Sequence, residues 1–117
     1  MKFNFLIAAM LAIAAGAVQA HARLEASEPG ASSTLDSAPK VLRLQFNEAL
    51  EPAFSKVTLR DAANRDIALP KAVPDKARPK EMAVPLPPLA AGNYRVLWST
   101  VTHDGHKTKG EFTFRVK

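Results

Sequence analysis

The C-terminal stretch Glu111-Phe112-Thr113-Phe114-Arg115-Val116-Lys117 alternates strictly between charged or polar residues and apolar ones. Such alternation is typical of a half-buried β-strand, because successive side chains point to opposite faces of a sheet. The same period of two recurs in residues 94–98, 41–46 and 55–60. Weaker strand patterns cover residues 23–26, the neighbourhood of Ile67, and residues 82–86. We therefore predict an all-β fold of about seven short strands, the number typical of an immunoglobulin-like β-sandwich.

The N-terminal segment has the pattern of a secretory signal peptide. Lys2 precedes an apolar run over residues 5–15, and Val18-Gln19-Ala20 supplies small residues at a cleavage point. The run is shorter than the roughly 20 residues of a transmembrane helix, although an uncleaved anchor is the alternative. We predict a signal peptide over residues 1–20, export to the periplasm, and one mature domain over residues 21–117 that does not insert into the membrane.

Charge and cysteine content exclude several classes of function. The chain carries a formal net charge of +5, but its basic residues alternate with apolar positions and few aromatics lie between them. This pattern is typical of solvated strand faces and argues against a nucleic-acid partner. The sequence contains no cysteine, so a disulfide and a thiolate metal site are both excluded. The fold must therefore be held together by packing.

Two of the three histidines lie in one short stretch, Thr102-His103-Asp104-Gly105-His106, between two predicted strands. The third, His21, follows the predicted cleavage point and would become the first residue of the mature protein. Its α-amine and imidazole could then chelate a metal, with His106 adding a nitrogen and Asp104 an oxygen. Three nitrogens and one oxygen suit Cu(II), nickel could also fit, and zinc is less well served. We predict one Cu(II) per chain.

The individual signals of this site are weak. Asp-Gly is an ordinary turn dipeptide, so Asp104-Gly105-His106 alone does not establish a metal site. His103 has the opposite parity to Asp104 in an extended segment, which indicates an exposed residue or a neighbour of the site rather than a ligand. Glu48, at the end of a predicted strand, could equally be a solvated side chain.

Taken together, these stretches resemble the CopC family of periplasmic copper-binding proteins over nearly the whole mature length. The matching segments are His21, Glu28-Pro29, Leu44-Gln45-Phe46-Asn47-Glu48, Leu89-Ala90-Ala91-Gly92-Asn93-Tyr94-Arg95-Val96-Leu97-Trp98, Asp104-Gly105-His106 and Gly110-Glu111-Phe112-Thr113-Phe114. The resemblance implies a seven-stranded Greek-key sandwich and a Cu(II) site at His21, Asp104 and His106. It also implies that Glu48 is a possible neighbour of that site. Some relatives hold Cu(I) in a methionine-rich loop, whereas this chain has Asp75-Lys76-Ala77-Arg78-Pro79 there, so we expect no Cu(I) site.

The function implied is that of a non-enzymatic, monomeric copper buffer or carrier, which the resemblance links to a CopD-type inner-membrane copper transporter. One alternative is a copper-dependent redox enzyme with an N-terminal histidine chelate. Such an enzyme needs an open coordination position, which Asp104 would fill here. The other alternative is a metal-free structural sandwich, because fold and residue types alone do not determine function.

Overall fold

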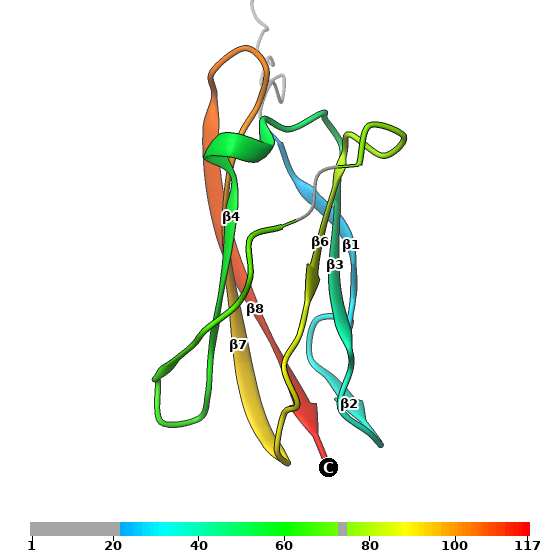
Figure 1. Cartoon of the computed structure of the whole chain (residues 1–117), viewed down its shortest axis with the longest axis vertical. Coiled ribbons are helices and arrows are strands. Elements are labelled where there is room, and N and C mark those ends of the chain that lie inside the picture. The colour runs from blue at the N-terminus through cyan, green and yellow to red at the C-terminus, as the bar shows by residue number, and fades with distance from the viewer. Residues whose placement is uncertain (1–21, 73–74) are drawn as a thin grey trace, which may run out of the picture.

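The structure is a computed structural model that describes residues 22–72 and 75–117. Two β-sheets face each other as the layers of a sandwich (Figure 1). The strands are β1 (Leu24–Glu28), β2 (Ser33–Leu35), β3 (Val41–Phe46), β4 (Lys56–Arg60), β5 (Asp66–Ile67), β6 (Glu81–Pro85), β7 (Gly92–Val101) and β8 (Lys107–Val116), and the 3₁₀ helix η2 spans Pro52–Phe54. One sheet has the order β1-β3-β6 and the other β2-β8-β7-β4-β5. The predicted all-β sandwich is confirmed.

The strand count differs from the prediction in one respect. The structure adds an eighth strand, β2, in which Ser33–Leu35 pair in parallel with Phe114–Val116 of β8. Two of its three residues are polar, so no alternation of apolar and polar side chains marks it in the sequence. It forms because β8 offers a free edge, which is a property of the assembled sheet.

The core consists of the apolar positions of the alternating patterns. In β3, Leu42, Leu44 and Phe46 are buried, whereas Arg43 and Gln45 are exposed. The Phe46 ring meets the edge of Trp98 in the opposite sheet, with centroids 5.0 Å apart at 74°, an arrangement that aromatic pairs favour. Aromatic packing therefore helps to join the two sheets, which no disulfide can link because the sequence contains no cysteine.

Gly110 makes room for that tryptophan. It lies opposite Trp98 in the β7–β8 ladder, and a Cβ at residue 110 would lie 2.5 Å from Trp98 Cζ2. Glycine is thus needed at this position because the indole covers the backbone, and not because the chain bends there.

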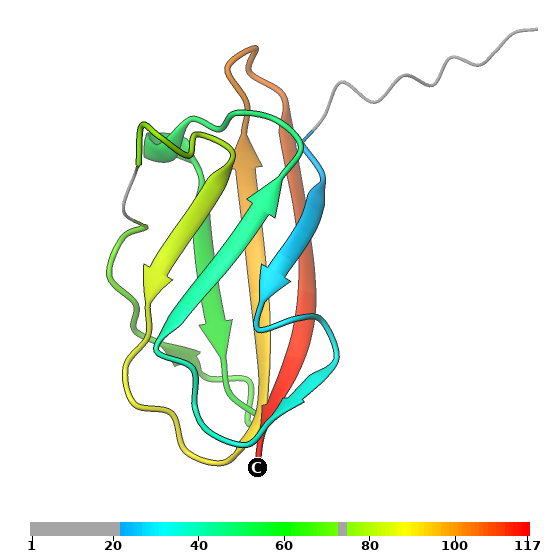
Figure 2. The same cartoon turned by 90° about the vertical axis from the view of Figure 1, so that its right-hand side faces the viewer.

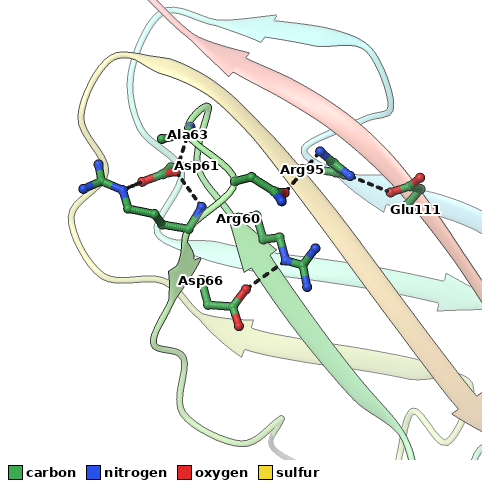
Figure 3. Close-up of polar contacts among 8 residues, drawn as sticks. Arg60, Asp61, Ala63, Asp66, Arg95 and Glu111 are labelled. Carbon is green, nitrogen blue, oxygen red and sulfur yellow. Dashed lines mark hydrogen bonds and ion pairs between the residues drawn. The ribbon is translucent and has the colours of Figure 1, made fainter.

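The turn from β4 to β5 closes the end of the sheet that lies away from the β7–β8 turn (Figures 1 and 3). Asp61 Oδ1 accepts hydrogen bonds of 2.9 Å from the backbone N–H groups of Ala63 and Arg65. The bond from the Arg65 backbone is the main cause that lowers the pKa of Asp61. Asn64 adopts a positive φ of 64°, as a turn asparagine often does. These contacts shape the turn that joins the antiparallel strands β4 and β5.

Candidate metal centre

The turn between β7 and β8 carries Asp104 and His106 at the opposite end of the sandwich (Figures 1 and 2). Its backbone is closed by two hydrogen bonds, from Thr102 N to His106 O at 3.0 Å and from Gly105 N to Thr102 O at 2.9 Å. Gly105 has a φ of +86°, a conformation that suits glycine. The turn is anchored below by Thr102, which is buried and forms a bridge with Leu50. These contacts hold the turn in one shape.

Within the turn, Asp104 and His106 contact each other. The two oxygens of Asp104 have different partners: Thr102 Oγ1 donates a hydrogen bond to Oδ1, and Oδ2 lies 3.0 Å from His106 Nδ1. The hydrogen bond from Thr102 is the largest cause that lowers the pKa of Asp104. Partial burial opposes it, and the charge of His106 adds to it. While Nδ1 bonds to the carboxylate, Nε2 is the nitrogen with which His106 could bind a metal.

His103 lies apart from this pair. Its Nδ1 contacts Glu51 Oε1, and the Glu51 backbone N–H donates to Val101 O at 2.8 Å. The two imidazoles of the turn therefore have different partners, Glu51 for His103 and Asp104 for His106. His103 and Asp104 form a turn rather than an extended segment, so the parity argument from the sequence does not apply to them.

The first described residues are attached beside this turn. Ala22 is buried, and its carbonyl accepts a hydrogen bond of 3.0 Å from Thr108 Oγ1, two residues after His106. The following residue, Arg23, is held by Asn47, which follows β3 of the smaller sheet. Asn47 Oδ1 accepts a hydrogen bond of 2.6 Å from Arg23 N, and the Asn47 backbone N–H donates to Arg23 O at 3.1 Å. Residues 22 and 23 are thus fixed between the two sheets.

Glu48 follows Asn47 and carries an oxygen that needs a partner. Its Oε2 is buried and has no hydrogen bond with any of the residues that the structure describes. A buried carboxylate oxygen without a donor or cation is unfavourable. An amine, an imidazolium or a metal ion would be a suitable partner for this oxygen.

His21 lies outside the described residues, so the predicted ligand set is not tested. Within residues 22–72 and 75–117, no group of three or more histidine, aspartate or glutamate side chains could hold a metal ion. The pair Asp104 and His106 supplies two of the predicted donors, and a complete site needs a further residue. The assignment of His21 remains a prediction.

Sequence reasoning missed the residues that support the site. Thr102, Thr108 and Asn47 carry no sequence signal of a metal site, because their roles arise from contacts across the fold.

Met82 is the only methionine after residue 20, and it is buried in the core on β6. In the described residues, no helix is long and apolar enough to cross a membrane.

Comparison with known proteins identifies the family. Copper resistance protein C of Pseudomonas syringae pv. tomato is 37% identical over 99% of this chain and 95% of its own length. The crystal structure of PcoC, a methionine-rich copper resistance protein from Escherichia coli, matches with a TM-score of 0.74 and 38% identity over 84% of this chain and all of PcoC. The copper transport protein CutJ of Bacillus subtilis is 32% identical over 83% of this chain, which corresponds to 18% of CutJ. The CopC domain family matches residues 24–117, so the chain belongs to the CopC family.

Proposed function

We propose that the mature protein binds one Cu(II) ion through the α-amine and imidazole of His21, the imidazole of His106 and the carboxylate of Asp104. These donors supply three nitrogens and one oxygen, a set that suits the tetragonal geometry of Cu(II). Glu48 would lie beside the site and is proposed as a neighbour, not as a ligand. His103 is proposed to stay outside it.

The observation that carries the proposal is the hydrogen bond between Thr108 Oγ1 and Ala22 O, 3.0 Å long. Ala22 is bonded to His21, and Thr108 is two residues from His106. This hydrogen bond therefore lies one residue along the chain from His21 and two residues from His106. Two segments 86 residues apart in sequence are therefore in contact next to the proposed ligands.

Two further features support the choice of these residues. Glu48 follows Asn47, which binds Arg23, and its buried Oε2 has no partner among the described residues, so the mature amine or a bound cation would offset its burial. Asp104 has a lowered pKa and is therefore ionised at neutral pH, as a carboxylate ligand or a partner of a ligating imidazole must be. Both features favour a cation at this end of the sandwich.

The proposed role is that of a periplasmic copper carrier or buffer, produced by cleavage of a signal peptide over residues 1–20. The family consists of copper-binding proteins rather than enzymes, so no redox turnover is assigned. We propose that the protein acts as a monomer and hands its copper to a CopD-type inner-membrane transporter. The match to a small part of the larger copper transport protein CutJ supports a link with transport.

Mass spectrometry of the exported protein, with and without Cu(II), tests maturation and stoichiometry together. The expected result is a chain that begins at His21 and gains one copper ion. A matched protein that keeps Ala20 before His21 should bind Cu(II) far more weakly, because its α-amine is then part of a peptide bond. Equal affinity of the two forms would refute the chelate.

A further inference from the structure

The most exposed large apolar side chain in the described residues lies close to the candidate metal centre. Phe54, on η2, is 70% exposed, whereas the next, Val41, is 36% exposed. Ser55 holds η2 against β7, because its buried Oγ accepts a hydrogen bond of 3.1 Å from Val101 N. Phe54 is therefore presented to solvent by an anchored element and not by a loose loop.

Several lysines lie on the outer face of the larger sheet, and two of them, Lys107 and Lys109, line a hollow together with Phe54. Lys56, Ser99 and Lys109 are neighbours across β4, β7 and β8, and Lys107 lies opposite Val101. Elsewhere on this face, Arg60 and Arg95 form ion pairs with Asp66 and Glu111. In the described part of the chain, Lys56, Lys107 and Lys109 form none. The region around Phe54 thus keeps three uncompensated positive charges.

The surface between the ring and the lysines is concave. A hollow of about 380 Å³ is lined by Phe54, Val101, Lys107 and Lys109, and it adjoins a second hollow of about 470 Å³ beside Leu97. The two hollows share Ser99 and Lys109, so they form one groove along β7. We define this surface, comprising Phe54, Lys56, Ser99, Val101, Lys107 and Lys109, as the Phe54 face.

We infer that the Phe54 face is a docking surface for an acidic protein that inserts an apolar side chain beside Phe54. The charge requires an anionic partner, and unpaired lysines at a rim steer such a partner. A hollow beside an exposed aromatic ring fits a protruding side chain, whereas a lipid headgroup surface would leave it unfilled. The inference extends and rests on the proposed function, because Lys107 adjoins His106 and a docked protein would lie near the proposed metal site.

An NMR titration of the ¹⁵N-labelled mature protein without copper tests this face. The probe is a short acetylated peptide of glutamates around one central leucine. Control peptides carry glutamine in place of glutamate, or alanine in place of leucine. We expect amide shifts at the Phe54 face with the acidic leucine peptide, weakened by salt and much smaller with either control. Shifts spread over the molecule, absent, or centred on another surface would overturn the proposal.

Matched variants separate this face from general charge. Phe54→Ala should weaken peptide binding about fivefold or more, and Val41→Ala should not. The double variant Lys56→Glu/Lys109→Glu should weaken it about tenfold or more. Its control, Lys40→Glu/Arg115→Glu, changes the net charge equally at residues outside the face. If both double variants weakened binding equally, only net charge would be at work and the proposal would fail.

Binding to membranes and binding of copper are measured as two further arms of this experiment. If vesicles of phosphatidylglycerol bound the protein with the same dependence on Phe54 while the peptide did not, the face would be a membrane surface and the proposal would be overturned. Copper affinity of each variant is measured separately and should be unchanged, since Lys107 is left intact. Absence of copper binding by the wild type would refute the proposed function without affecting the peptide result.

Discussion

Replacing Thr108 by valine tests the link between the first described residues and the turn that carries Asp104 and His106. Valine keeps the branched shape of threonine but removes the hydroxyl, which bonds to Ala22 O at 3.0 Å and contacts the Thr100 hydroxyl at 2.9 Å. Each lost hydrogen bond reduces stability by about 1 kcal/mol, and leaving the buried Thr100 hydroxyl without a partner adds to this. We expect the free energy of unfolding to fall by about 2–3 kcal/mol.

The same change should weaken copper binding. If the Ala22 anchor contributes about 1 kcal/mol to the placement of the N-terminus, the affinity for Cu(II) should fall about fivefold. Competition titration with a chelator of known affinity measures this, and urea unfolding followed by Trp98 fluorescence measures stability. Thr113→Val is the matched control on the same strand. Its side chain is exposed and has no hydrogen bond in the described structure, so it should change stability by less than about 0.5 kcal/mol.

The outcome for Thr108→Val distinguishes two roles of the anchor. A loss of stability with unchanged copper affinity would refute the argument that this hydrogen bond organises the metal site. Equal losses of affinity in Thr108→Val and Thr113→Val would refute it as well, because the anchor is absent from the second position.

Three further results are expected. In competition titrations, His106→Ala should remove most of the copper affinity, Asp104→Ala should remove less, and His103→Ala should remove little. Equal losses of affinity at the two histidines would show that the histidine ligand is misassigned. Copper affinity should fall continuously from about pH 8 to pH 5, because an α-amine, whose ordinary pKa is about 7.7–8.0, and the two imidazoles must lose protons to bind. Asp104 adds nothing to that slope, because its lowered pKa keeps the carboxyl ionised throughout this pH range. Its contribution to folding stability is lost only as the pH falls below the ordinary carboxyl range. A copper affinity that did not change with pH would point to carboxylate ligands instead. Gly110→Ala should destabilise the fold by about 1–3 kcal/mol in urea unfolding, since the new Cβ would lie 2.5 Å from the Trp98 ring; an unchanged midpoint would contradict that packing.

The position of the turn that carries Asp104 and His106 could be predicted without the structure. The pattern Asp104-Gly105-His106 between two alternating stretches implies a turn between neighbouring strands, and the turn lies between β7 and β8. Asp104 and His106, two residues apart, contact each other across Gly105. These features are local, so the spacing of residues carries them.

Alternation with a period of two in residues 41–46, 94–98 and 111–117 was enough to determine an all-β sandwich, because each side chain's face follows from its position in the strand. Other features depend on partners distant in sequence, and no local pattern encodes them. Only the tertiary structure decided that β2 joins the edge of β8, that Thr108 anchors Ala22, and that Glu48 buries an oxygen without a partner among the described residues. The physical reason is that hydrogen bonding and burial depend on which surfaces meet when the two sheets pack, whereas periodicity reports only which side of its own strand a residue occupies.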